Sequence, residues 1–226
     1  MVTSWHDYPA GLLGYTERSL LAWFEQNVRR TETWIDVGAH YGYTALALCR
    51  LVGPSGHIYA FEPVLSTAAH LAATRRLNGL DQLHVVPLGL SDTGNISPVE
   101  AGLVRGMAEH RRLDHHVTDT IHVVALDQVW DGLAAGKREV HGVKIDIQGM
   151  ELKALKGMQA ILRSARPKLA IEFHPGVDRS DLLSLLQNCG YDPVGRPIAP
   201  PSTEREPSYA DDRTYIFTPR AKIVES

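Results

Sequence analysis

Short apolar segments of strand length alternate with segments of helical periodicity along most of this 226-residue chain. The strand-length segments are TWIDV, HIYAF, LHVVPLGL, IHVVAL, VHGVKIDI, KLAIEF, YDPVG and RTYIFT. Apolar residues recur at helical spacing between them, over about 16–28, 44–52, 65–77, 151–163 and 178–188, with a short helix from Asp127. This alternation predicts a parallel sheet covered by helices on both faces, with right-handed crossovers. Ligands of such sheets bind beyond the carboxyl ends of the strands.

The chain length favours one domain over residues 1–226, because it allows one sizeable core but not two ordinary domains with a linker. Residues 1–30 are expected to form a helical lead-in, with Thr16 as the N-cap of its helix. Residues 93–120 break the alternation with Gly, Pro and charged residues, and predict an irregular insertion on the acceptor side of the site. Residues 197–212, rich in Pro, Ser and Glu, predict a mobile loop.

Charge and composition exclude several classes of protein. The 23 Lys and Arg against 26 Asp and Glu give a formal net charge of -3, and no basic run is long enough to follow a phosphate backbone. No stretch approaches about 18 consecutive apolar residues, so a membrane partner is not expected. The two cysteines lie in helical segments without metal-ligand spacing, as in a reducing compartment. We therefore expect a cytoplasmic protein with a small-molecule substrate and no nucleic-acid partner, and a homodimer is left open.

The first strand-length segment ends in a glycine-containing loop, Asp36-Val-Gly38-Ala-His40-Tyr-Gly42. Its two glycines allow the backbone to turn sharply and to approach a ligand without a Cβ in the way. The loop lacks the third glycine of the G-x-G-x-x-G pattern, which holds a pyrophosphate. An acidic residue before the glycines suits the cationic amino group of a methionine moiety. The candidate cofactor contacts in this loop are Asp36, Gly38, His40 and Gly42.

Two further strand ends carry polar residues. Glu62 follows HIYAF, where nucleoside-binding folds place a carboxylate that accepts both ribose hydroxyls. Ser91 and Asp92 follow LHVVPLGL, where the Asp92 carboxylate could accept from the exocyclic amine of an adenine. The structural alternatives are ordinary, since an Asp can cap a turn and a Glu-Pro pair can simply end a strand. In their joint order, these residues predict a cofactor that contains adenosine.

Taken in order, the segments WIDVGAHYGYT, YAFEP, GLSD, ALD, VKIDIQGMELKALKGM and IEFH resemble the FkbM methyltransferases. The resemblance runs from about Gly14 to His174. It implies a Rossmann-like class I methyltransferase fold, with a mostly parallel seven-stranded sheet, helices on both faces and an antiparallel last strand. It also implies S-adenosyl-L-methionine as the methyl donor, and a hydroxyl of a sugar, polyketide or other secondary metabolite as the acceptor. Two residues depart from the family pattern: His40 stands where Asn is common, and Gln148 where Glu is common.

Methyl transfer to an alcohol needs in-line approach and a base for the hydroxyl proton. Asp146 ends the strand VHGVKIDI, the position nearest a transferable methyl in this fold type, and is expected to orient the acceptor and contact the cofactor. The alternative role for Asp146 is a cap for the helix that begins near Glu151. His174, two residues after Glu172 at the end of KLAIEF, is the best-placed base. We predict that Asp146, Glu172 and His174 are the catalytic residues.

Two other roles for this trio stay open. Glu172 and His174 could merely hydrogen-bond at the edge of the sheet. All three residues could instead hold a divalent cation that lowers the pKa of the acceptor hydroxyl, although nothing else in the sequence completes a ligand shell. The prediction is therefore a site without a resident metal.

The sequence as a whole predicts an O-methyltransferase that acts on a small molecule and uses S-adenosylmethionine. An N- or carboxyl-methyltransferase of a small molecule or peptide is the first alternative. A cofactor-binding subunit without catalysis is favoured only by Gln148. A nicotinamide-dependent oxidoreductase is disfavoured, because no Tyr-x-x-x-Lys pair follows VHGVKIDI and the glycine spacing is that of a different loop.

Overall fold

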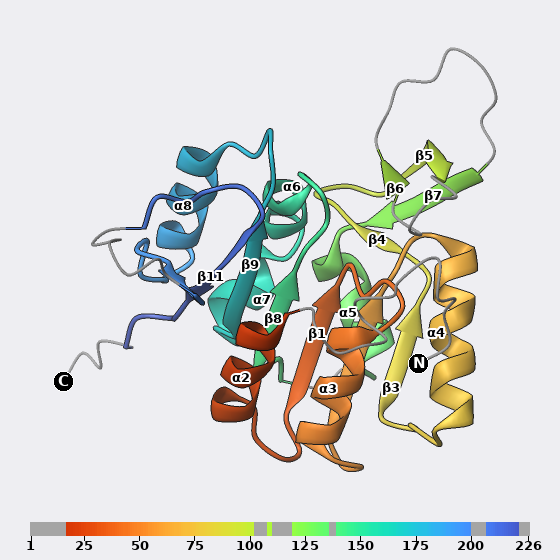
Figure 1. The fold of residues 1–226 in the computed structure, drawn as a ribbon. Helices are drawn as coiled ribbons and strands as arrows, with labels where there is room; N and C mark the ends of the chain where they lie inside the picture. The colour runs from red at the N-terminus through yellow and green to blue at the C-terminus, as the bar shows by residue number, and fades with distance from the viewer. Residues whose placement is uncertain (1–16, 102–107, 110–118, 136–138, 200–206, 222–226) are drawn as a thin grey trace.

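Seven strands form the main sheet, in the order β10-β11-β9-β8-β1-β2-β3 (Figure 1). The structure is a computed structural model that describes residues 17–101, 108–109, 119–135, 139–199 and 207–221. Strands β1, β2, β3, β8 and β9 run parallel, whereas β11 is antiparallel to β9 and β10 is antiparallel to β11. The prediction of a mostly parallel seven-stranded sheet with antiparallel pairing at its end is confirmed. The strand bounds are β1 Thr33–Val37, β2 His57–Phe61, β3 Leu83–Val86, β8 Gly142–Ile145, β9 Lys168–Phe173, β10 Arg196–Pro197 and β11 Arg213–Phe217.

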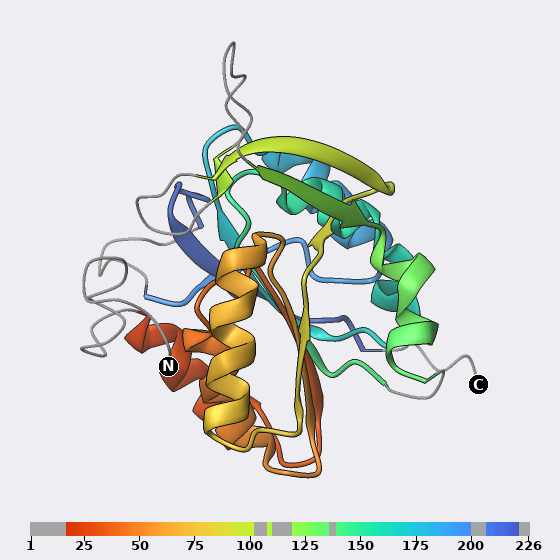
Figure 2. The same cartoon turned by 90° about the vertical axis from the view of Figure 1, so that its right-hand side faces the viewer.

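Helices cover both faces of this sheet (Figure 2). One face carries α2 (Arg18–Asn27), α3 (Tyr43–Val52) and α4 (Leu65–Leu77), and the other carries α5 (Leu126–Leu133), α6 (Glu151–Lys156), α7 (Gln159–Ser164) and α8 (Arg179–Asn188). Successive side chains of a strand point to opposite faces, so each strand contributes to two cores. Trp34 of β1 packs edge-on against Phe24 in the first core, with ring centroids 5.6 Å apart, while Ile35 lies in the second.

A second, smaller sheet stands beyond the end of the main sheet at which the parallel strands finish (Figures 1 and 2). Its strands are β4 (Gly89–Leu90), β5 (Asn95–Ala101), β6 (Ala108–Glu109) and β7 (Asp119–Val124), in the order β4-β7-β5-β6. The described part of 93–120 is thus largely strand and not irregular, while a position of this segment on the acceptor side stays a prediction. Residues 102–107 and 110–118 of that segment lie outside the described residues.

Two continuous elements expected from the sequence are each divided in the structure. The segment LHVVPLGL forms β3 and β4 in different sheets, because Pro87 between them has no N–H to continue a ladder. The helix expected over 151–163 is two helices that meet at Gly157, where an added Cβ would lie 1.9 Å from the carbonyl oxygen of Ser91. The carboxylate of Asp127 accepts the N–H groups of Ala160 and Ile161 near the start of α7, at 2.8 and 3.1 Å.

The two ends of the described chain also differ from expectation. Helix α2 begins at Arg18, after Glu17 in the left-handed region at φ 56°, and Thr16 lies outside the described residues. The segment YDPVG is not a strand, because Tyr191 makes a single bridge to Pro219 and the ladder begins only at β10. In 197–212 the first residue belongs to β10, and residues 200–206 are not described, so mobility of this loop stays a prediction.

Candidate active site

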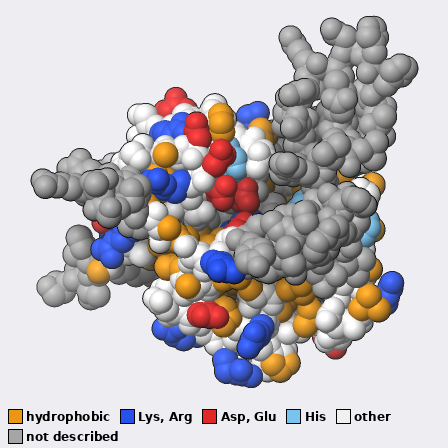
Figure 3. All heavy atoms as spheres, in the orientation of Figure 1, with side chains coloured by type: hydrophobic (Ala, Val, Ile, Leu, Met, Phe, Trp, Pro, Cys, Tyr) orange, Lys and Arg blue, Asp and Glu red, His pale blue; other side chains and the backbone are white. Residues whose placement is uncertain are grey.

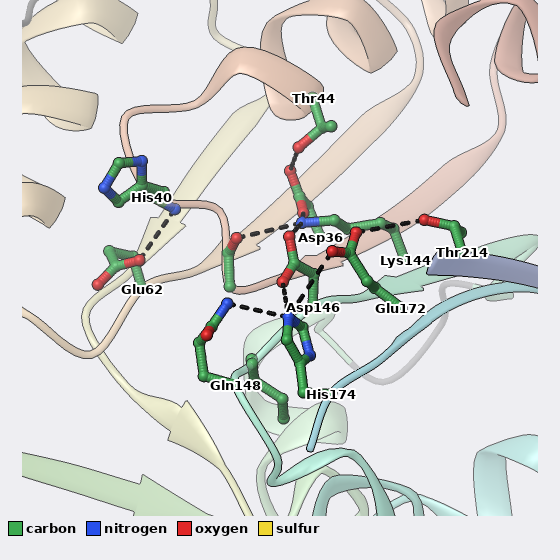
Figure 4. A network of polar contacts seen from close by, with 12 residues as sticks. Asp36, His40, Thr44, Glu62, Lys144, Asp146, Gln148, Glu172, His174 and Thr214 are labelled. Atoms are coloured by element: carbon green, nitrogen blue, oxygen red, sulfur yellow. Dashed lines mark hydrogen bonds and ion pairs between the residues drawn. The ribbon is translucent and has the colours of Figure 1, made fainter. Parts of the chain in front are cut away.

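The candidate site lies where β1, β2, β8 and β9 finish, and acidic side chains gather beside a histidine on the surface above these strand ends (Figure 3). A close view shows polar side chains from these strands and from the segments that follow them pointing toward one another (Figure 4). The parallel pairing of these strands brings residues far apart in the sequence to one edge of the sheet.

The loop after β1 is held tightly between the neighbouring strands. The N–H groups of Gly38 and Ala39 both donate to the carbonyl oxygen of Phe61 at 3.0 Å. Gly38 has φ 80°, and a Cβ at this position would lie 1.9 Å from the carbonyl oxygen of Asp146. Only glycine can occupy this position without moving the end of β8. The sharp turn predicted from Gly38 and Gly42 is confirmed, and Gly42 directly precedes α3.

Glu62 after β2 is fixed by two backbone donors. Its Oε2 accepts the N–H of His40 and its Oε1 accepts the N–H of Val64, each at 2.9 Å. Burial raises the pKa of the Glu62 carboxyl to about 7, against the lowering effect of these two hydrogen bonds. The contact between Glu62 and the His40 backbone joins two residues that the sequence predicted for one cofactor site, and the His40 imidazole packs against Tyr41.

Lys144 of β8 is a buried cation that the sequence analysis did not single out. Its Nζ lies 3.4 Å from Asp36 Oδ1 and 3.3 Å from Asp146 Oδ2, and it donates to the carbonyl oxygen of Gly38 at 3.2 Å. Burial alone would lower the pKa of Lys144, but Asp146, Asp36, Glu17 and Glu172 outweigh it and raise the pKa. A lysine inside the apolar segment VHGVKIDI was the available signal, because a buried charge requires a partner.

The Asp36 carboxylate has protein partners on both oxygens. Thr44 Oγ1 donates to Oδ2 at 2.6 Å, and Lys144 lies beside Oδ1. The side chain is fully buried. Contact of Asp36 with a cofactor therefore stays a prediction, while the structure shows it joining β1, β8 and α3.

His174 is oriented by a buried carboxylate. Its Nδ1 lies 2.8 Å from Glu151 Oε1, and this oxygen also accepts the N–H groups of Ile147 and Gly149, each at 3.2 Å. Both His174 and Glu151 are almost completely buried. The imidazole Nε2 is thereby turned toward the strand ends, where Gln148 Nε2 lies 2.9 Å away. Sequence reasoning gave Glu151 only the start of a helix, and nothing in the sequence paired it with His174.

Asp146, Glu172 and His174 converge as predicted. The His174 Nε2 lies 3.5 Å from Asp146 Oδ1 and 3.7 Å from Glu172 Oε1, and Glu172 Oε2 accepts from Thr214 Oγ1 at 3.3 Å. The side chains of Asp146 and Glu172 are 21% and 23% exposed, so both can meet a small molecule. Burial and then repulsion from Asp146 raise the pKa of Glu172 to about 7.

Glu17 adds a further acidic group to this site. Burial raises its pKa, and its charge interacts with those of Lys144, Asp146 and Asp36. If Thr16 were the N-cap, as expected from the sequence, Glu17 would be an ordinary residue of the first helical turn. In the structure Glu17 precedes α2 and has a left-handed backbone conformation, so its side chain does not have the orientation of a helical residue. No pattern in the sequence signals that conformation.

Ser91 and Asp92 follow β4 of the smaller sheet. Ser91 is buried and donates from Oγ to Asp92 Oδ1 at 3.0 Å, while Asp92 is exposed. A Cβ added to Gly89 would touch Pro63 at 3.4 Å, so β4 passes close to the turn that follows Glu62. The adenine contact predicted for Ser91 and Asp92 stays a prediction.

The trio that the sequence offered as an alternative cation site is close-set. One ligand atom from each of Asp146, Glu172 and His174 lies within 4.8 Å of the others. All three already face protein donors: the Lys144 ammonium is next to Asp146, the Gln148 amide is next to His174, and Thr214 Oγ1 donates to Glu172. A divalent cation at this position would have to share Asp146 with a buried ammonium group.

Comparison with known proteins identifies the family. A profile of the Methyltransferase FkbM domain matches residues 36–193. The chain belongs to the FkbM methyltransferases. Hexuronic acid methyltransferase AglP of Haloferax volcanii is 30% identical to this FkbM protein over 154 residues, which are 67% of this chain and 59% of the relative. The chain thus spans less than two thirds of the length of that curated relative.

Solved structures support the fold of this FkbM protein. The FkbM methyltransferase of Methylobacillus flagellatus matches 96% of this chain and 56% of its own, with a TM-score of 0.58 and 18% identity. Fibrillarin of Aeropyrum pernix, solved with bound S-adenosyl-L-methionine, matches 95% of this chain and 76% of its own, with a TM-score of 0.53 and 13% identity. The class I methyltransferase fold expected from the resemblance is confirmed. Among the described residues, no helix has both the length and the apolar character needed to cross a bilayer.

S-adenosylmethionine is the cofactor of this family, and the donor set of the site fits it. The two oxygens of Glu62 each have one backbone donor, which leaves lone pairs free for ribose hydroxyls. Asp146 and Glu172 offer negative charge for a cationic sulfonium. Gly38 turns the backbone sharply between these two regions, and the Asp146 carbonyl oxygen occupies the position of its missing Cβ.

Proposed function

We propose that this chain is an S-adenosylmethionine-dependent O-methyltransferase whose acceptor is a hydroxyl of a small molecule, such as a sugar, polyketide or other secondary metabolite. The observation that carries this proposal is the Glu151–His174 pair, which aims the imidazole Nε2 at the strand-end carboxylates. When bound, S-adenosylmethionine supplies an electrophilic methyl group. An alcohol that receives this methyl must lose its proton, and a neutral imidazole is a suitable base near neutral pH.

The proton balance fits this pair of residues. The neutral His174 carries its hydrogen on Nδ1 and donates it to Glu151, so Nε2 holds the free electron pair. S-adenosylmethionine would supply the methyl group, and His174 Nε2 would take the proton that the acceptor hydroxyl loses. Asp146 and Glu172, at 3.5 and 3.7 Å, stabilise the imidazolium that results.

We propose that the cofactor binds on the side of the β1 loop that lies away from His174. Glu62 would accept the ribose hydroxyls, and the backbone of 38–42 would lie against the methionine portion. Ser91 and Asp92 would flank the adenine from the smaller sheet. Asp146, between these groups and His174, would face both cofactor and acceptor.

A carboxyl-methyltransferase is the second candidate, because a hexuronic acid carries a carboxylate as well as hydroxyls and a relative is named for that substrate. A carboxylate acceptor has no proton to lose and would not need His174. It would also approach Asp146 and Glu172, whose negative charges oppose it. These two features favour the hydroxyl.

The first experiment tests the cofactor by calorimetric titration with S-adenosylhomocysteine and, separately, with NAD. Micromolar binding of S-adenosylhomocysteine that Glu62→Gln weakens at least tenfold supports the assignment, whereas preferential binding of NAD would overturn it. The second experiment supplies S-adenosylmethionine with neutral sugars and hexuronic acids, and identifies products by mass spectrometry. A methyl product that resists mild alkali, formed by the wild type and lost in His174→Gln, is an ether and supports the proposal. An alkali-labile product whose formation survives His174→Gln is an ester and indicates the second candidate.

A further inference from the structure

Gln148 contacts the base from the side opposite Glu151. The residue lies just after β8 in the left-handed region at φ 55°, followed by Gly149 at φ 98°. This turn sends the side chain back toward β9, where its carboxamide nitrogen lies 2.9 Å from His174 Nε2 (Figure 4). Gln148 is exposed although its carboxamide reaches a buried imidazole. It therefore stands between solvent and the nitrogen that takes the proton.

We propose that Gln148 is a positioning residue that hydrogen-bonds His174 in both of its protonation states and thereby keeps this base usable at neutral pH. The inference rests on the proposed function, because it concerns the residue that removes the acceptor proton. It assigns a purpose to the amide at a position where FkbM proteins commonly have Glu.

The chemistry of the amide supports this role. A carboxamide offers an N–H₂ donor on one side and an oxygen acceptor on the other, and the two exchange by rotation of the group. With no acceptor bound, the nitrogen lies 2.9 Å from Nε2 and donates to the electron pair of the neutral imidazole; an acceptor hydroxyl must take this place before it can give up its proton. Facing imidazolium, the oxygen accepts the Nε2 hydrogen. The amide can therefore bond the neutral imidazole before an acceptor binds and the imidazolium after proton transfer, and it does not select one state.

A carboxylate at position 148 would act differently, because it can only accept. It would hold the imidazolium and oppose its deprotonation. An opposite charge within hydrogen-bonding distance typically shifts a pKa by about 1 to 3 units. With Glu at 148, His174 would remain protonated over a range of pH in which the present protein can use it as a base.

The charged groups around His174 make the difference between an amide and a carboxylate at position 148 important. Glu151 of α6 bonds Nδ1, while Asp146 after β8 and Glu172 of β9 face Nε2. The Lys144 ammonium also contacts this set, through Asp146, and is shared with Asp36. Together, the nearby carboxylates outweigh the lowering effect of burial and raise the pKa of His174. A fourth carboxylate would add to an environment that already favours the imidazolium.

The test is a pH titration of the histidine side chains by nitrogen-15 NMR, with the full-length protein and no acceptor. The chain has 11 histidines, and the signals of His174 are assigned as those absent from His174→Gln. Three proteins are compared: wild type, Gln148→Glu and Gln148→Leu. Leu matches Gln in size but cannot hydrogen-bond, so it separates loss of the contact from gain of a charge.

We expect wild-type His174, when neutral, to carry its hydrogen on Nδ1. Gln148→Glu should raise the pKa of His174 by one unit or more, and Gln148→Leu should shift it upward by less than half a unit. Once an acceptor is found, the acid limb of kcat/KM should move upward in Gln148→Glu by the same amount, with the rate at alkaline pH recovered. An unchanged pKa in Gln148→Glu, or the Nε2–H tautomer in the wild type, would overturn the proposal.

Two controls keep the result interpretable. Thermal unfolding and S-adenosylhomocysteine titration of each variant show whether the fold and the cofactor site are retained. If Gln148→Glu fails to fold, Gln148→Asp places the carboxylate on a shorter side chain and is titrated in its place. The NMR measurement needs no methyl transfer, so failure of the proposed reaction and failure of the Gln148 role are observed separately.

Discussion

Lys144 and Asp36 face each other across neighbouring parallel strands, with Nζ 3.4 Å from Oδ1 and both side chains buried. The pair stands directly behind the strand ends, and its ammonium group also contacts Asp146 and the carbonyl oxygen of Gly38. One cation thus ties the loop after β1 to Asp146 after β8.

Removal of this cation should destabilise the protein strongly. Lys144→Met leaves the buried Asp36 carboxylate without its positive partner, and breaking a buried pair in this way typically costs about 3–5 kcal/mol. Urea unfolding at pH 7 measures the loss. The matched control is the double variant Asp36→Asn with Lys144→Met, which removes both charges and should recover at least half of the stability. Equal stability of the single and double variants would show that the pairing is not what matters.

The glycine at position 38 should be irreplaceable for a steric reason beyond its backbone angle. Gly38→Ala places a Cβ 1.9 Å from the carbonyl oxygen of Asp146, at φ 80°. Gly79 is the matched control, with φ 60° and nothing within 4 Å of an added Cβ. Gly79→Ala should cost only the left-handed strain of about 1–2 kcal/mol. Gly38→Ala should cost about 3 kcal/mol or more, by the clash in addition, and should also abolish S-adenosylhomocysteine binding in calorimetry.

Similar losses of stability in Gly38→Ala and Gly79→Ala, with cofactor binding intact in both, would contradict the close packing of the loop on β8. A loss of binding alone in Gly38→Ala would place the glycine against the cofactor and not against Asp146.

The sequence predicted the main sheet and its helices well, because burial on alternate faces leaves a clear pattern in segments such as Trp34–Ile35. It failed where one residue overrides a continuous apolar pattern. Pro87 sends a single apolar segment into two sheets, and Gly157 divides a helix because the backbone of Ser91 occupies the space of a side chain. Neither outcome can be read from periodicity, because the first depends on an N–H that Pro87 lacks and the second on the packing of Gly157 against Ser91, far away in the chain.

The site, too, was predicted in part from the sequence pattern, and the rest depends on the packed structure. Residues at strand ends were found because parallel strands gather their ends at one edge, and Asp146, Glu172 and His174 do meet there. Lys144, Glu151 and Glu17 were missed as site residues. Their places depend on which face of a strand, which turn of a helix and which backbone conformation carries them, and these are properties of the packed structure.

Methyl transfer by this protein should not require a divalent metal. The reason is Lys144, which already places a positive charge 3.3 Å from Asp146 and opposes a second cation there. Titration of the protein with Mn²⁺, followed by its electron paramagnetic resonance, should show binding no tighter than millimolar and unchanged by Asp146→Asn. Activity should persist after EDTA treatment and dialysis. Tight Mn²⁺ binding that Asp146→Asn abolishes would instead assign the trio to a cation.

Cofactor affinity should weaken as the pH falls below neutral, because of Glu62. Burial raises the pKa of this carboxyl to about 7, so that it is largely ionised above that pH and protonated below it. Only the ionised form accepts from two ribose hydroxyls while it also accepts the N–H groups of His40 and Val64. At lower pH the Glu62 carboxyl must lose its proton before the cofactor binds, so the affinity should fall by up to tenfold per pH unit below 7.

Calorimetric titration with S-adenosylhomocysteine between pH 5.5 and 8.5 measures this dependence. Glu62→Gln should bind more weakly than the wild type at pH 8 and lose most of the slope, because the amide does not titrate. Glu172→Gln is the informative comparison, since burial and Asp146 also raise the pKa of Glu172 to about 7. A slope that disappears in Glu172→Gln and persists in Glu62→Gln would transfer the pH dependence to the acceptor side of the site, and would remove Glu62 as the ribose ligand.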